Sequence, residues 1–181
     1  MKKKECYVLE GVSLIKDFEF VDKAIYKDTD RYILRFIEIS TDDKNICVAG
    51  TDGKRLHCVK FDKSKEIILP PCGTYSFGVL HNERCLIKEP NIDYPDWRNT
   101  YPKKLKNYGY YSFDRGQTSH LHAKIFETTK TCVDYEFLKD ANFNGVEIFG
   151  DIENKDYVSP ILIKSGNREA LIMPLSYNYY N

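Results

Sequence analysis

The sequence predicts an α+β fold built mostly from antiparallel sheets, with two helices. Aromatic residues make up 14% of the 181 residues, and Tyr and Phe are typical of strands. Short apolar runs are separated by turn sequences rich in Asp, Asn, Gly and Pro. A helical segment is followed by several strands, twice, without the regular strand–helix alternation of a parallel sheet.

The first elements are a short strand over residues 6–9 and a helix from Leu14 to about Tyr26. Ser13 is the expected N-cap of this helix, because its hydroxyl can accept a hydrogen bond from a backbone N–H of the first turn. Its apolar residues recur at helical spacing, so one face is expected to pack on a core: Leu14, Phe18, Val21 and Ile25.

Six short strands are expected after this helix, and two of the turns between them are Asx- and Gly-containing sequences at 41–45 and 51–54. A connecting segment then follows over 89–107, Pro-rich at first and basic later. The expected strands are 32–39, 45–48, 55–61, 66–69, 74–79 and 85–88.

The remaining residues are predicted to form a second part of the same kind. Asp134 is the expected cap of a short helix over 135–141, and Ser165-Gly-Asn167 is the last hairpin turn. Two domains are therefore expected, residues 1–102 and 103–181. The predicted strands are 108–113, 120–126, 146–149, 158–163 and 169–175.

Composition excludes several classes of protein. Lys plus Arg and Asp plus Glu both number 27, so the whole chain has no net attraction to nucleic acid. No apolar run is long enough to span a membrane, and no apolar segment of a signal peptide follows the basic start. The six cysteines form no close pairs, which favours reduced thiols in a cytoplasmic protein. No cofactor is expected.

Three sequence blocks carry the functional information. The first runs from Asp30-Arg-Tyr-Ile-Leu34 to Thr51-Asp-Gly-Lys-Arg-Leu56, where the Asp-Gly pair is typical of a tight hairpin turn. The second is Tyr94-Pro-Asp-Trp-Arg98, followed by Pro102. The third is Ala170-Leu-Ile-Met-Pro-Leu175.

Together these blocks resemble segments of the bacterial DNA sliding clamp, the β subunit of DNA polymerase III. The first two resemble the start and end of the clamp's middle domain, and the third resembles the end of its last domain. The resemblance implies a clamp-like fold and a binding protein of DNA replication and processivity that is not an enzyme. Its expected partners are the clamp-binding peptides of replication and repair proteins.

In the family these blocks meet in an apolar pocket that accepts short linear peptides. Carried over to this chain, the resemblance implies four apolar walls, two rigid prolines and one adaptable Met side chain. The glycine allows the backbone to turn, and the arginine can offer hydrogen-bond donors to a peptide. The implied residues are Leu34, Thr51, Gly53, Lys54, Arg55, Leu56, Pro102, Ile172, Met173, Pro174 and Leu175.

The chain departs from the family in length, because a clamp subunit has three domains and this chain has room for at most two. Each clamp domain contributes two helices to the DNA channel, whereas no second helix is predicted over 74–93 or 108–131. An alternative is therefore a DNA-encircling clamp assembled from several copies, which would need a basic inner surface.

A metal-dependent enzyme is the second alternative. On a strand, His120 and His122 would direct two imidazoles to the same face, and Cys132 or Cys85 could join them. The spacing matches no known zinc motif, and the sequence contains no nucleophile elbow or phosphate-binding loop.

Overall fold

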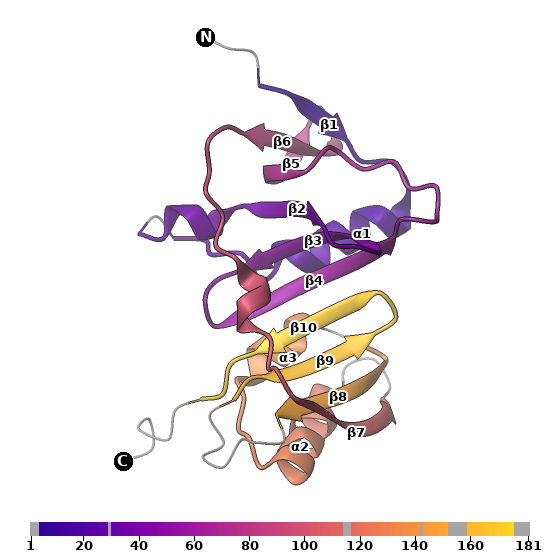
Figure 1. Cartoon of the computed structure of the whole chain (residues 1–181), viewed down its shortest axis with the longest axis vertical. Coiled ribbons are helices and arrows are strands. Elements are labelled where there is room, and N and C mark those ends of the chain that lie inside the picture. The colour runs from indigo at the N-terminus through magenta and orange to yellow at the C-terminus, as the bar shows by residue number, and fades with distance from the viewer. Residues whose placement is uncertain (1–3, 29, 114–116, 142, 152–158, 176–181) are drawn as a thin grey trace. The chain divides into compact units, whose positions relative to one another are not determined.

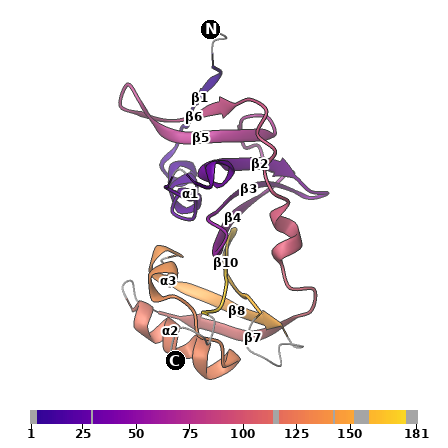
Figure 2. The same ribbon diagram turned by 90° about the vertical axis from the view of Figure 1, so that its left-hand side faces the viewer.

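Two units make up the chain in a computed structural model: Met1–Asp96, called unit 1, and Trp97–Asn181, called unit 2. Within them the structure describes residues 4–28, 30–113, 117–141, 143–151 and 159–175. Each unit contains an antiparallel sheet with one or two α-helices on one face (Figures 1 and 2). The α+β prediction with mostly antiparallel strands is therefore confirmed.

Unit 1 contains six strands in the order β1-β6-β5-β2-β3-β4, and helix α1 contacts β3 and β4. All of its pairings are antiparallel. The β5–β6 hairpin lies between β2 and β1, so β1 is the last strand at its edge of this sheet. The bounds are β1 Cys6–Val8, α1 Val12–Asp22, β2 Ile37–Thr41, β3 Asn45–Thr51, β4 Arg55–Asp62, β5 Gly73–Leu80 and β6 Glu83–Glu89.

The core of unit 1 forms where α1 packs on the sheet. Phe18 is fully buried and its ring stacks on that of Phe77, with the ring centroids 6.2 Å apart. Gly50 on β3 permits close packing, because a Cβ atom there would lie 2.8 Å from Cγ2 of Ile25 and 3.0 Å from the Val21 carbonyl oxygen. Only a residue without a side chain fits between this part of the chain and β3.

Unit 2 contains four strands in the order β10-β9-β8-β7, again with antiparallel pairings. Its core combines Leu121 and Ile125 of α2 and Leu138 of α3 with the buried residues 161–163 of β9. The bounds are β7 Leu105–Ser112, α2 Thr118–Thr129, α3 Tyr135–Ala141, β8 Gly145–Asp151, β9 Ile161–Ser165 and β10 Arg168–Ile172.

Several element predictions are confirmed. Strands occupy most of the predicted ranges 6–9, 45–48, 55–61, 74–79, 85–88, 108–113, 146–149 and 169–175. Residues 161–163 of the predicted range 158–163 also lie in a strand. Residue 158 of the predicted strand 158–163 lies outside the described residues. The backbone N–H of Glu136 donates to Oδ1 of Asp134 over 2.8 Å, so Asp134 caps α3 as expected. Gly166 has φ +60° at the turn between β9 and β10.

The predicted strand over 120–126 is wrong, because these residues belong to α2. The alternation around His120-x-His122 resembled a strand, but Leu121 and Ile125 are spaced four residues apart and are the buried residues of a helix. The described part of the chain therefore has three α-helices instead of two. The block 108–131 does contain a helix, contrary to expectation.

Three further local predictions are wrong. The N-cap of α1 is Gly11 at φ +88°, and Ser13 lies inside the helix, which ends at Asp22 instead of near Tyr26. The start of the predicted strand 32–39 is a 3-10 helix, Tyr32–Arg35, in which Leu34 N–H donates to the Arg31 carbonyl oxygen over 3.0 Å. Residues 66–69 form no strand.

No helix in the described residues is long and apolar enough to cross a membrane.

We expect Phe18→Ala to lower the free energy of unfolding by about 3–5 kcal/mol, because it removes a fully buried ring and leaves a cavity. Val12→Ala on the same helix is the matched control. Its side chain is 70% exposed, so its effect should stay within about 0.5 kcal/mol. Urea denaturation followed by circular dichroism measures both. Equal effects of the two substitutions would contradict this packing of α1.

The β2–β3 turn should weaken in acid. The backbone N–H groups of Lys44 and Asn45 donate to Asp42 and lower its pKa from 3.8 to about 2. A carboxyl group whose pKa is lower in the folded state stabilises the fold above its unfolded pKa and loses this effect as the pH falls. The stability difference between wild type and Asp42→Asn should therefore shrink from pH 5 to pH 2. A difference independent of pH would argue against this role.

Candidate functional site

The residues implied by the family resemblance divide between the two units, and each group is described within its own unit. Unit 1 contains the first group, which surrounds the turn between β3 and β4. Unit 2 contains the second group, which consists of the end of β10 with the residues after it and of one residue before β7. We call them the turn group (Leu34, Thr51 and 53–56) and the strand-end group (Pro102 and 172–175).

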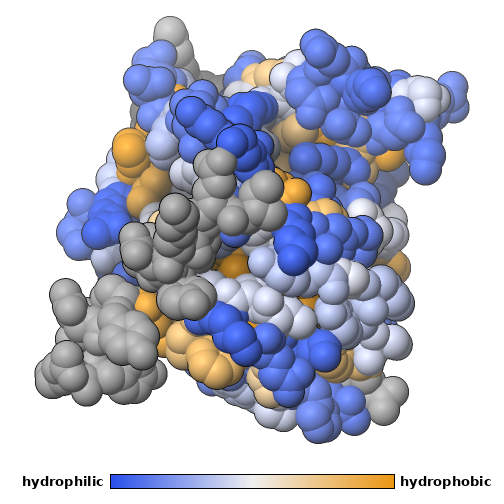
Figure 3. Space-filling view, turned by 60° about the horizontal axis from the view of Figure 1, so that its bottom comes forward, coloured by the Kyte–Doolittle hydropathy of each residue, from blue (hydrophilic) through white to orange (hydrophobic). Residues whose placement is uncertain are grey.

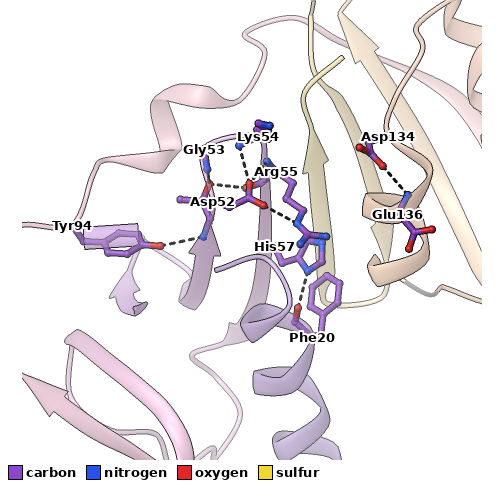
Figure 4. A network of polar contacts seen from close by, with 10 residues as sticks. Phe20, Asp52, Gly53, Lys54, Arg55, His57, Tyr94, Asp134 and Glu136 are labelled. Carbon is purple, nitrogen blue, oxygen red and sulfur yellow. Dashed lines mark hydrogen bonds and ion pairs between the residues drawn. The ribbon is translucent and has the colours of Figure 1, made fainter. Parts of the chain in front are cut away.

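The backbone of the β3–β4 turn is held by its own side chains. The Asp52 carboxylate accepts hydrogen bonds from the backbone N–H groups of Lys54 and Arg55, at 2.8 and 3.0 Å (Figure 4). Oγ of Thr51 donates to the Arg55 carbonyl oxygen over 2.6 Å and accepts from Gly53 N–H over 3.0 Å. Gly53 has φ +87°, a conformation that favours glycine, as the sequence predicted.

The Arg55 side chain takes part in the same arrangement. Its Nε donates to Oδ2 of Asp52 over 3.1 Å (Figure 4). Both side chains are largely shielded from solvent. The family resemblance predicts that Arg55 offers hydrogen-bond donors to a peptide. In the structure its Nε binds the carboxylate that organises the turn, and the role toward a peptide stays a prediction.

Two segments distant in the sequence lie against this turn. A Cβ atom on Gly53 would be 3.7 Å from Cδ1 of Leu34 and 3.0 Å from Nη1 of Arg31. Thr51 N–H donates to the hydroxyl oxygen of Tyr94 over 3.2 Å (Figure 4). Burial raises the pKa of Tyr94, so this hydroxyl stays protonated. The first and second sequence blocks therefore do meet within unit 1.

Tyr94 and Asp52 were not among the predicted site residues, although both fix the turn. The role of Asp52 has a signal in the sequence. An Asp in a turn typically accepts a hydrogen bond from the backbone N–H two residues further along, which forms an Asx turn. The contact of Tyr94 with Thr51 joins residues far apart in the sequence. No local pattern indicates it.

Below the turn, His57 of β4 connects the strand to α1. Its Nδ1–H donates to the Phe20 carbonyl oxygen over 2.7 Å, and its ring stacks on that of Phe20 with the centroids 4.3 Å apart (Figure 4). Leu56 is 3% exposed and belongs to the core, whereas Leu34 is half-buried and Lys54 is exposed.

The strand-end group begins where β10 leaves the core. Ile172 is fully buried, but the next residue, Met173, is 40% exposed. Pro174 forms a β-bridge with Val133, and Leu175 N–H donates to the Cys132 carbonyl oxygen over 2.9 Å. These contacts anchor the chain on both sides of Met173 and leave its thioether side chain at the surface.

Pro102 is half-buried and follows a residue that contacts β10 directly. The Tyr101 hydroxyl donates to Oε2 of Glu169 over 2.8 Å, and Lys164 forms an ion pair with the other carboxylate oxygen over 3.0 Å. The segment around Pro102 is thereby held to the strand that carries the third sequence block.

The geometry proposed for a metal site from His120 and His122 is wrong. Both residues lie on α2, where positions two apart point to different sides of the helix. Nε2 of His122 lies 2.9 Å from the Val133 carbonyl oxygen and is its hydrogen-bond donor. Within the residues that the structure describes, no group of three or more His, Cys, Asp and Glu side chains could hold a metal ion.

Solved structures similar to this chain define its fold as that of a DNA sliding clamp. The DNA polymerase III subunit beta of Borrelia burgdorferi superimposes with a TM-score of 0.66 over 97% of this chain, at 13% identity. The Thermotoga maritima beta subunit gives 0.60 over 96%, at 11% identity. The Helicobacter pylori beta clamp bound to a DNA ligase peptide gives 0.60 over 97%, at 12% identity.

The likeness confirms the clamp-like fold that the three sequence blocks indicated. The chain spans 64% of the Borrelia protein, 65% of the Thermotoga protein and 67% of the Helicobacter protein, about two thirds of their lengths. No protein-family model matches the chain, and no curated protein matches its sequence.

We expect Gly53→Ala to lower the free energy of unfolding by about 1–2 kcal/mol, because alanine is strained at φ +87°. The matched control is Gly78→Ala, on β5, where an added Cβ atom would meet no atom within 4 Å. That change should be neutral or slightly stabilising. Urea denaturation compares the two variants, and equal stabilities would show that the turn does not depend on its glycine.

Proposed function

We propose that this chain is a clamp-like protein of DNA replication that binds short linear peptides and performs no catalytic step. Residues 1–102 would correspond to the middle domain of a sliding clamp and 103–181 to a shortened last domain. The pocket would be formed by the turn group together with the strand-end group. The proposal also makes the protein cytoplasmic, like the replication proteins it would bind.

The main support is the agreement between the fold and the sequence blocks. The clamp likeness covers nearly the whole chain, and the Helicobacter pylori structure of this fold holds a DNA ligase peptide. The first two sequence blocks also contact each other, because Thr51 N–H donates to the Tyr94 hydroxyl, and side-chain hydrogen bonds of Thr51 and Asp52 hold the turn.

The chemistry of the two groups suits an apolar peptide. Met173 offers a flexible, polarisable side chain that can adapt to different apolar partners. Leu34 is half-buried beside a turn of fixed conformation. A rigid frame with a few exposed apolar side chains lowers the entropic cost of binding an extended peptide.

Peptide binding can be tested by fluorescence anisotropy with a fluorescein-labelled copy of the ligase peptide bound by the Helicobacter clamp. We expect saturable binding that Met173→Ala weakens about tenfold, as the loss of one buried apolar side chain predicts. Leu105→Ala is the matched control in unit 2, because Leu105 is 37% exposed and lies outside both groups.

A second pair of variants tests the turn group. Leu34→Ala should weaken binding, whereas Ile33→Ala, which removes the neighbouring side chain at 45% exposure, should not. Absence of saturable binding, or equal affinities for all four variants and the wild type, would reject the proposed pocket.

A further inference from the structure

Unit 1 contains a groove that shares no residue with the proposed peptide pocket. Its volume is about 720 Å³, within the roughly 300–1,000 Å³ usual for ligand sites. The end of β1, the start of α1, the end of β4 and the segment 66–70 form it. We call it the α1 groove, and its aliphatic and aromatic lining includes Leu9, Leu14, Phe61, Ile67, Ile68 and Leu69.

The segment 66–70 exposes a large aliphatic side chain beside the groove. Ile68 is 96% exposed, although it lies between Ile67 and Leu69, which are both half-buried. Val8, at the end of β1, also lines the groove and is 48% exposed. Exposed aliphatic side chains gathered around one groove are typical of an interaction site.

By contrast, hydrophobic residues on the face shown in Figure 3 form small separate patches among hydrophilic ones, as far as its coloured residues show. Scattered patches of that kind are ordinary for a protein surface. The α1 groove differs because its apolar side chains line a single hollow.

The backbone beside the groove is available for pairing. Among the described residues, no backbone–backbone hydrogen bond involves Ile67, Ile68 or Leu69. Such donors and acceptors can pair with an extended segment in the manner of an added β-strand. This feature favours a peptide over a compact small molecule.

Charge identifies the kind of peptide. Glu10, Asp17 and Glu66 are the charged side chains among the described residues that line the groove, and all three are carboxylates. Glu10 and Glu66 are exposed and come from different elements, before α1 and after β4. Lysine or arginine side chains would complement this rim, and the complementarity would select the partner.

We propose that the α1 groove binds an extended segment of a partner protein in which aliphatic residues alternate with lysine or arginine. The aliphatic side chains contact the exposed Ile68 and its neighbours, and the basic side chains pair with Glu10 and Glu66. This second docking site does not depend on the pocket proposed above.

The test uses the full chain and three fluorescein-labelled twelve-residue peptides with the same four leucines. The other positions include four lysines, four glutamines or four glutamates. Fluorescence anisotropy at low salt should show the lysine peptide binding at least tenfold more tightly than the glutamine peptide, and the glutamate peptide most weakly. The preference should diminish as salt is added.

Matched variants connect the binding to the groove. Ile68→Ser should weaken lysine-peptide binding at least about tenfold, whereas Leu80→Ser, at an exposed residue of the β5–β6 hairpin, should not. Glu66→Lys should abolish the preference for the lysine peptide, whereas Glu83→Lys, on β6, should retain it. Circular dichroism confirms that each variant is folded.

Three results would overturn the proposal. The first is equal affinity for the three peptides, and the second is unchanged lysine-peptide binding by Ile68→Ser. The third is a dimer in analytical ultracentrifugation that Ile68→Ser converts to a monomer, because a second copy of the chain would then occupy the groove. Binding of the ligase peptide serves as the internal reference. If Ile68→Ser leaves it unchanged, the two sites are separate, and either proposal can fail without the other.

Discussion

The close packing at Gly50 is the constraint on which unit 1 depends. A side chain at this position would collide with Ile25 and with the Val21 backbone, so α1 could not lie on β3. One strand further, the His57 hydrogen bond to the Phe20 carbonyl fixes the same helix along its axis. Thr51, which follows Gly50 directly, therefore begins the β3–β4 turn from a position that packing has already determined.

The turn then has little conformational freedom. Asp52 satisfies two backbone donors and the Arg55 side chain, and Tyr94 holds Thr51 from outside the hairpin. At the strand-end group the bridge between Val133 and Pro174 has a similar effect, because it fixes the backbone next to an exposed Met173. In both units, polar and backbone contacts fix the main chain, and apolar side chains remain at the surface.

Short-range features of the fold could be predicted from the sequence. Phe18 and Val21 show the period of a helix, Asp52-Gly53 has the chemistry of a tight turn, and Asp134 caps the helix that follows it. Helix α2 was missed because only Leu121 and Ile125 are buried in it, and the intervening polar residues weaken its period. The residues 67–69 have strand-like composition, but no neighbouring strand pairs with them. The Tyr94 contact with Thr51 depends on the whole fold of unit 1.

The position of β1 has a consequence for how unit 1 assembles. Cys6 pairs with Ile87, so the first strand joins this sheet only through β6, which lies far along the chain. In unit 2 the first strand, β7, pairs with β8 directly, without an intervening hairpin. Pairings between distant residues slow folding, because a long loop must close before they form. During synthesis from the N-terminus, β1 leaves the ribosome long before its partner, and the β3–β4 hairpin can form while β1 is still unpaired.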